Sequence, residues 1–181
     1  MVTIDYIIAC VQELIKRYGT RNPFELCEAL KVIIKYEDFI ELKGMYRKLG
    51  RNRYIMLKRD LIDCMLAIVC LHELGHDQLH RKLGENKSLR DSVIFGREPI
   101  ELEANMYAAE VKLIDDDIME LVYSGYTVDQ IAMETKTCGD LVAIKLDIMK
   151  HKGYPLRDSE YNANFLRVAE AKFIEKDYSP C

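Results

Sequence analysis

Apolar residues recur along the chain with two different periods, and the change between them divides the sequence. Residues 3–18 have the three-to-four-residue spacing of an amphipathic helix, and the Asn-Pro-Phe-Glu pattern at Asn22 starts a second short helix. Residues 31–58 are instead rich in β-branched and aromatic side chains, which favours strands. We expect three antiparallel strands there, with the last hairpin turning near Gly50.

Helical spacing returns at Asp60 and continues to about Leu83, which predicts the central helix of the fold. The next residues, 84–99, are polar and interrupted by glycine and proline, which indicates a loop. A further long helix is expected from Ile100 to Ile114. A small sheet packed on such helices predicts the α+β class.

The last part of the chain is expected to be helical. Residues 127–151 have the length and the turn of a helix-turn-helix-like pair. Two N-cap signals would start its helices, Thr127 with Gln130 and Thr137 with Asp140. A helical stretch is also expected near residues 159–175, whereas the aspartates at 115–117 indicate a solvated helix end.

Composition and charge narrow the function. The 181 residues suffice for one domain with a short appendage, and 26 basic against 30 acidic residues argue against a protein that binds nucleic-acid backbones. The first 19 residues are amphipathic and predict neither a signal peptide nor a membrane span, so we expect a cytoplasmic protein. The six cysteines form no CxxC pair and are expected to be reduced, small apolar residues.

Three of the four histidines fall within residues 70–80, in the segment CLHELGHDQLH. On a helix His72 and His76 lie about 40° apart on successive turns, so their imidazoles can bind one zinc ion. Glu73 lies about 100° round the helix, where it can take a proton from a water at the metal. His80 extends the same face, but three successive turns of a straight helix cannot converge on one ion, so we do not expect it to be a ligand.

A catalytic zinc usually has three protein ligands, so one more must come from elsewhere in the chain. The following helix offers Glu101, Glu103 and Glu110, and geometry alone does not choose among them. The alternative interpretation is a partly exposed helix with solvated histidines. Gly75 favours the metal site, because a glycine inside a helix costs about 1 kcal/mol relative to alanine and suggests that another backbone or a substrate comes close.

Two motifs in the same order carry a resemblance to a known family. The segment LHELGHDQLH is followed by IELEANMYAAEVKL, and together they resemble the ImmA/IrrE family of metallopeptidases, whose hallmark is HExxH with a Glu-Ala-Asn helix. The resemblance extends over roughly residues 15–115. It implies a zincin-like metallopeptidase domain, which we place at residues 1–123, followed by a helical C-terminal extension at residues 124–181.

The resemblance also implies ligands and an activity. The glutamate before Ala-Asn corresponds to Glu103, so that His72, His76 and Glu103 would hold one Zn²⁺. Glu73 would be the general base, and Mn²⁺ is an alternative metal. Candidates for the oxyanion donor or for contacts that support the ligands are Tyr46, His80, Asn105 and Tyr107. Family members cleave, or bring about cleavage of, a helix-turn-helix repressor that controls a phage, a mobile element or a stress response.

Two other function classes fit the sequence. The chain could be a non-proteolytic regulator that binds the repressor, with a structural metal or none, or it could bind DNA through residues 127–151. Asp140 and Asp147 in the second helix of this pair argue against DNA, so recognition of the repressor or packing against the metal domain fits better. In a peptidase, the free edge of the strand at residues 52–58 is expected to receive the substrate as an added strand, with a solvated edge as the alternative.

Overall fold

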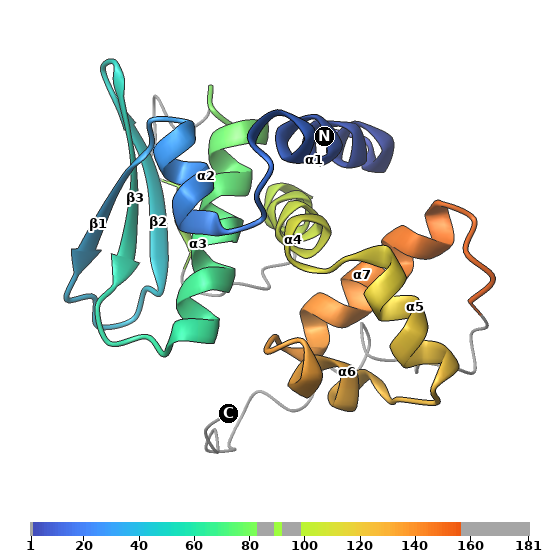
Figure 1. The fold of residues 1–181 in the computed structure, drawn as a ribbon. Helices are drawn as coiled ribbons and strands as arrows, with labels where there is room; N and C mark the ends of the chain where they lie inside the picture. Colours follow the sequence, from blue (N-terminus) through green and yellow to red (C-terminus); the bar gives the residue numbers. More distant parts are fainter. Residues whose placement is uncertain (1, 83–88, 92–98, 157–181) are drawn as a thin grey trace. The chain divides into compact units, whose positions relative to one another are not determined.

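The computed structural model describes residues 2–82, 89–91 and 99–156 (Figure 1). Contacts divide the chain into two compact units, Met1–Lys112 and Leu113–Cys181. The domain limits expected from the sequence, with a boundary after residue 123, stay a prediction, and the contacts assign residues 113–123 to the second unit. Each unit is described by itself.

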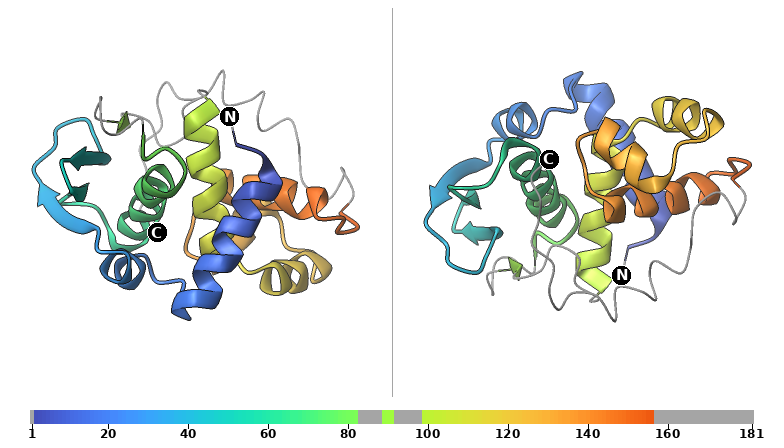
Figure 2. Two further views of the ribbon diagram at one scale, coloured as in Figure 1. Left: turned by 90° about the horizontal axis from the view of Figure 1, so that it is seen from above. Right: turned by 90° about the horizontal axis from the view of Figure 1, so that it is seen from below.

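Within the described residues, the first unit consists of four helices and a sheet. In chain order its elements are α1 (Ile4–Tyr18), α2 (Pro23–Ala29), β1 (Ile33–Glu37), β2 (Gly44–Leu49), β3 (Asn52–Lys58), α3 (Asp63–Leu79), β4 (Leu89–Asp91) and α4 (Pro99–Lys112). The sheet, α3, α4 and α1 follow one another as layers (Figure 2). The α+β class is therefore confirmed. Because α3 lies between the sheet and α4, side chains on two of its sides are buried.

In the part of the chain that the structure describes, the sheet has four strands in the order β1-β3-β2-β4. The hairpin of β2 and β3 is antiparallel and turns at Gly50, whose φ of 59° is left-handed, as the sequence predicted. β1 pairs with β3 in parallel, with Ile33 opposite Tyr54. The expectation of three antiparallel strands is wrong in this respect, because the residues that favour a strand do not specify which neighbour it pairs with or in which direction.

A fourth strand lies within the segment that was expected to be a loop. β4 pairs antiparallel with β2, and Asp91 lies opposite Gly44. Three residues are too few to show the period of a strand, so the sequence gives no signal for it. The expectation of a free edge on residues 52–58 is also wrong, because β3 has β1 on one side and β2 on the other. Within the described residues the outer strands are β1 and β4.

Close packing of α3 against α4 depends on a glycine. A Cβ at Gly75 would lie 3.1 Å from both the Cα and the carbonyl oxygen of Ala104, so the glycine allows the backbone of α4 to approach. On another side of α3, Cys70 faces the core, and its Sγ lies 3.8 Å from the Sγ of Cys27. The described cysteines are free thiols.

The second unit contains α5 (Asp115–Tyr123), α6 (Val128–Glu134) and α7 (Gly139–His151). α6 begins with the expected capping box of Thr127 and Gln130. The N-cap of α7 is Cys138, which makes no side-chain cap hydrogen bond, instead of the expected Thr137. The helix expected near residues 159–175 lies outside the described residues.

The aspartates at 115–117 form the first turn of α5, and Asp116 and Asp117 are exposed, as expected of a solvated helix end. Acidic residues stabilise the first turn of a helix, because the backbone N–H groups there carry partial positive charge. Asp115 also pairs with Lys145 at 2.5 Å and Lys152 at 2.8 Å, both from α7 or its C-cap. Among the described helices of both units, none is long and apolar enough to span a membrane.

Candidate metal centre

Two histidines of α3 face each other across one helical turn. The Nε2 atoms of His72 and His76 are 3.1 Å apart, and the two rings are nearly perpendicular. His72 is fully buried and His76 is 1% exposed, because this part of α3 lies between the sheet and α4. The contact is the one expected from a four-residue spacing, and the burial contradicts a solvated helix.

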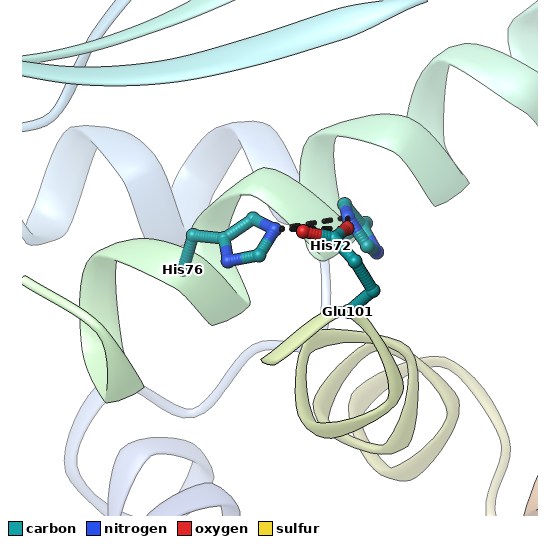
Figure 3. A group of neighbouring side chains, drawn as sticks. All are labelled: His72, His76 and Glu101. Atoms are coloured by element: carbon teal, nitrogen blue, oxygen red, sulfur yellow. Dashed lines mark hydrogen bonds and ion pairs between the residues drawn. The ribbon is translucent and has the colours of Figure 1, made fainter. Parts of the chain in front are cut away.

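Glu101, in the first turn of α4, completes this group (Figure 3). Its Oε2 lies 3.2 Å from Nε2 of His72 and 3.4 Å from Nε2 of His76. The three ligand atoms all lie within 4.8 Å of one another, and two imidazoles with a carboxylate are a usual ligand set for catalytic zinc. The Glu101 side chain is 12% exposed, whereas the side chain of His72 is fully buried.

The charges of the group suit a cation. Burial favours a higher pKa for Glu101, but hydrogen bonds with His72 and His76 outweigh it and lower the pKa to about 2. Burial lowers the pKa of His76 below its usual value, although Glu101 partly opposes this. At neutral pH the group therefore contains a carboxylate and a neutral His76, which are the protonation states that bind metals.

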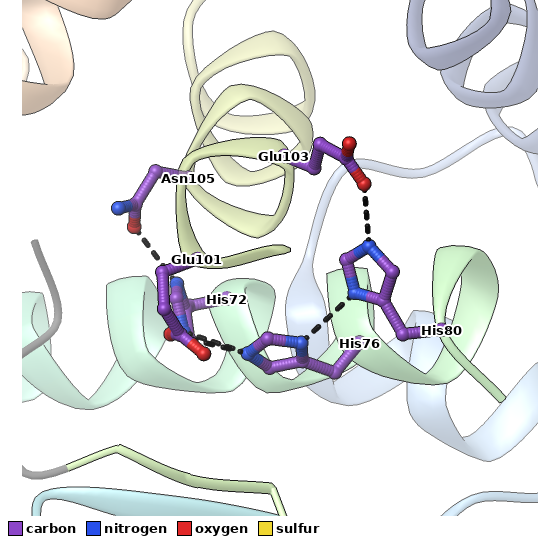
Figure 4. Close-up of polar contacts among 6 residues, drawn as sticks. All are labelled: His72, His76, His80, Glu101, Glu103 and Asn105. Atoms are coloured by element: carbon purple, nitrogen blue, oxygen red, sulfur yellow. Dashed lines mark hydrogen bonds and ion pairs between the residues drawn. The ribbon is translucent and has the colours of Figure 1, made fainter. Parts of the chain in front are cut away.

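The structure does not bring Glu103 to the histidine pair, contrary to the ligand that the resemblance implied. Glu103 follows Glu101 by two residues, about 200° round α4, so the two carboxylates leave the helix on different sides. Oε2 of Glu103 lies 2.7 Å from Nε2 of His80, and Nδ1 of His80 lies 3.0 Å from Nδ1 of His76 (Figure 4). Glu103 is thus linked to His76 through the ring of His80.

Asn105 shares a face of α4 with Glu101, because the two positions are four residues apart, about one helical turn. Its Oδ1 lies 2.8 Å from Nδ1 of His72, so Asn105 and Glu101 contact the same ring (Figure 4). This spacing could have favoured Glu101 in the sequence, because Glu101 is the one of the three candidate glutamates that lies one helical turn from Asn105. Glu110 is buried farther along α4 and is outside the group that the described residues form.

Glu73 is fully buried and faces β2. A Cβ at Gly44 would lie 2.7 Å from Oε1 of Glu73, so β2 can pass this close to α3 only because residue 44 has no side chain. Glu73 therefore follows His72 in α3 and has its carboxylate close to β2, the strand that pairs with the outer strand β4.

Tyr46 and Tyr107 are core residues. Burial and the negative charge of Asp77 raise the pKa of Tyr46 on β2. Burial also raises the pKa of Tyr107 on α4, whose Cβ would lie 3.3 Å from a Cβ at Gly75. Asp77 in turn pairs with Arg53 of β3 at 2.6 Å. These contacts fix the sheet and α4 against the helix that carries the histidines.

Known proteins resemble the chain over the region of this site. A family model of the IrrE N-terminal-like domain, a peptidase family, matches residues 25–167. The "Uncharacterized immunity region protein 2" of Bacillus phage phi105 is 33% identical over 149 residues, which cover 82% of this chain and 93% of that protein. "Metallopeptidase ImmA" of Bacillus subtilis (strain 168) is 28% identical over 125 residues, which cover 67% of this chain and 73% of that protein. No solved structure matches.

Proposed function

Because the chain belongs to the peptidase family of the IrrE N-terminal-like domain, we propose that it is a zinc-dependent endopeptidase that cleaves a helix-turn-helix transcriptional repressor. Cleavage would relieve repression of a phage, a mobile element or stress genes. The names of two relatives, one an immunity region protein of a phage and one a metallopeptidase, support this proposal. The observation that carries the catalytic part is the convergence of His72, His76 and Glu101.

The ligands would be Nε2 of His72, Nε2 of His76 and a carboxylate oxygen of Glu101, the number of protein ligands usual for a catalytic zinc. A zinc ion held there would supply Lewis-acid chemistry, lowering the pKa of water toward about 7 and polarising the scissile carbonyl. Glu73 takes a proton from the attacking water and delivers it to the leaving amine. Manganese is the alternative metal, since mixed histidine and carboxylate sites accept several divalent ions.

An outer strand of the sheet offers a place for the substrate. β4 pairs with β2, and β2 passes directly beside Glu73 at Gly44. An extended segment of the repressor would pair with β4 through backbone hydrogen bonds, as peptides do when they add to the edge of a sheet. The segment must be a loop or unfold locally, which restricts cleavage to few bonds.

DNA binding by the second unit is less well supported. In a helix-turn-helix protein the second helix presents cations and hydrogen-bond donors to the DNA. On α7, Lys145 is 1% exposed and pairs with Asp115, so this lysine stabilises the unit and does not present its charge at the surface. Contact between the unit and the repressor protein fits this charge distribution better.

The test is cleavage of a helix-turn-helix repressor encoded beside this gene. The repressor is co-expressed with the wild-type protein, with Glu73→Gln or with Glu28→Gln, and its intact mass is measured. Glu73→Gln keeps the ligands and the side-chain shape but removes the proton acceptor. Glu28→Gln makes the same change at an exposed position of α2.

We expect one internal cut with the wild type and with Glu28→Gln, and an intact repressor with Glu73→Gln. The masses of the products identify the bond. An intact repressor with all three proteins, while the wild type contains metal and binds the repressor, would instead identify the chain as a non-proteolytic regulator. Cleavage by Glu73→Gln at the wild-type rate would exclude the assigned role of Glu73.

A further inference from the structure

A line of hydrogen-bonded side chains extends from the candidate metal centre to the N-terminal segment. His76 contacts His80 through the two Nδ1 atoms, at 3.0 Å, and His80 contacts Glu103 through Nε2, at 2.7 Å. Oε1 of Glu103 accepts a hydrogen bond from the backbone N–H of Val2 at 2.9 Å. Both oxygens of Glu103 therefore accept a hydrogen bond, one from Val2 in the segment before α1 and one from His80, the C-cap residue of α3. Figure 4 shows the contact with His80.

We propose that His80 and Glu103 are positioning residues that fix the orientation and the tautomer of His76 for metal binding. The proposal rests on the proposed metal site, because it assigns a role relative to a ligand of that site. It adds to that site two residues that would touch neither the metal nor the substrate. It also gives a role to His80, which lies four residues after the last histidine of the HExxH motif.

The direction of each hydrogen bond follows from the metal-binding form of His76. If Nε2 of His76 gives its lone pair to a metal, the neutral ring carries its proton on Nδ1. Nδ1 of His76 must then donate, and Nδ1 of His80 must accept. The proton of neutral His80 is therefore on Nε2, from which it is donated to the carboxylate of Glu103. One arrangement of protons satisfies every contact in the line.

Glu103 enforces this arrangement because a carboxylate can only accept. An ionised acceptor at 2.7 Å holds the proton of His80 on Nε2 and leaves its Nδ1 free of a proton. Metal-bound histidines commonly donate their second N–H to a carboxylate, a carbonyl or water. Here one further imidazole lies between the ligand and the carboxylate, so the negative charge of Glu103 acts through His80.

The two ligand histidines are supported differently. His72 contacts the neutral amide oxygen of Asn105 through Nδ1, whereas His76 is connected to an ionised group. His80 and Glu103 are each 6% exposed, so water competes little with these contacts. A substitution of His80 or Glu103 should therefore alter the contacts of His76 but leave the contact between His72 and Asn105 in place.

Two substitutions of His80 separate its two contacts. The amide of asparagine reaches about as far as Nδ1 of histidine, so His80→Asn can still accept from His76 but loses Glu103. The longer glutamine reaches about as far as Nε2, so His80→Gln keeps Glu103 but loses the acceptor for His76. Glu103→Gln keeps the shape of the carboxylate and removes its charge, and Glu110→Gln is the control, since Glu110 is equally buried on the same helix.

The first measurement is the dissociation constant for Zn²⁺, by competition with a chromophoric chelator, together with the thermal midpoint of each metal-free protein. We expect affinity to fall about 10–100-fold for His80→Gln and about 10-fold for Glu103→Gln, the range seen when partners of metal ligands are lost. His80→Asn should lose only a few-fold, and Glu110→Gln should match the wild type. Equal zinc affinities for all variants would overturn the proposal. It would also be overturned if both His80 variants lost zinc affinity equally and their metal-free forms lost thermal midpoint equally.

The second measurement does not need metal. In ¹⁵N-labelled, metal-free protein, long-range ¹H–¹⁵N spectra of the imidazoles report which nitrogen carries the proton. We expect His80 with its proton on Nε2 in the wild type, and a mixture of tautomers in Glu103→Gln. A proton on Nδ1 of His80 in the wild type would overturn the proposal. If the wild type binds no zinc, the proposed function fails, and this spectrum still decides the arrangement of His80 and Glu103.

Discussion

Gly44 of β2 lies directly against Glu73 of α3. A Cβ at residue 44 would come 2.7 Å from Oε1 of Glu73 and 2.5 Å from Cγ1 of Val69. Gly44 does not have a positive φ, so a side chain there would meet a steric conflict and no backbone strain. The β-branched side chain of Val69 keeps one rotamer in a helix, whereas the carboxylate of Glu73 can move. An added methyl group should therefore displace Glu73.

Gly44→Ala is expected to lower peptidase activity by about 10–100-fold, part of the roughly 10²–10⁴-fold that acid–base catalysis contributes. Zinc affinity should stay at the wild-type level, because the atoms nearest to the added methyl group belong to Val69 and Glu73 and not to a candidate ligand. Overpacking should also reduce the free energy of unfolding by about 1–3 kcal/mol. The rate is measured on a fluorogenic peptide that spans the cleaved bond, with Gly139→Ala as control, since a Cβ there meets its nearest atom at an ordinary 3.4 Å. Full activity of Gly44→Ala would mean that Glu73 is not held in place by β2.

Gly75→Ala should lower the zinc affinity without displacing Glu73. The added methyl group would lie 3.1 Å from backbone atoms of Ala104, so α4 must move, and α4 carries Glu101. Overpacking costs about 1–3 kcal/mol, which the higher helix propensity of alanine offsets by about 1 kcal/mol. We therefore expect a small loss of stability but a several-fold loss of zinc affinity. Isothermal titration with Zn²⁺ measures it, and an unchanged affinity would show that the ligands adjust independently of the helix contact.

Glu101→Gln tests the identity of the third ligand. An amide is a poorer zinc ligand than a carboxylate, so zinc affinity should fall by more than the roughly 10–100-fold that loss of a partner of a ligand costs. Glu103→Gln, which changes a residue outside the group, should lose less. Metal content after dialysis and the dissociation constant are measured for both variants. A larger loss of zinc affinity in Glu103→Gln than in Glu101→Gln would instead identify Glu103 as the ligand.

The relative positions of candidate residues within one helix could be predicted from the sequence. His72, Glu73 and His76 are separated by less than two turns, so their relative positions follow from the geometry of α3. The resemblance located the second motif, but the choice between Glu101 and Glu103 depends on how α4 is rotated about its axis against α3. That rotation is set by the close contact of Gly75 with Ala104, a tertiary feature.

The errors in the fold have a similar origin. Composition identified the strands β1, β2 and β3, but not the parallel pairing of β1 with β3, which depends on the whole sheet. β4 has only three residues and exists by pairing with β2. α5 was missed because the aspartates at 115–117 resemble a solvated segment, although acidic residues are also favoured in the first turn of a helix.

Asp115 provides a prediction about acid stability in the second unit. Burial opposes its ionisation, but hydrogen bonds from Lys145 and Lys152 outweigh this and hold the pKa of Asp115 below its usual value. Because the pKa is lower in the folded state, the stabilisation is fully present above the unfolded pKa of roughly 3.9 and is lost as the pH falls below it. The loss should therefore appear only under acidic conditions.

Asp115→Asn removes this dependence and the 2.5 Å ion pair of Asp115 with Lys145, which is 1% exposed. We expect a loss of about 2–3 kcal/mol at pH 7, somewhat below the roughly 3–5 kcal/mol for a fully buried pair, because Asp115 is partly exposed. Urea unfolding of the metal-free chain, followed by circular dichroism at pH 7 and pH 3, gives the difference between wild type and variant. The difference between wild type and variant cancels the pH-dependent contributions of the other carboxylates. These include Asp140, whose pKa is raised by burial. The difference should shrink toward pH 3, and a constant difference would mean that the pair with Lys145 does not stabilise the unit through its charge.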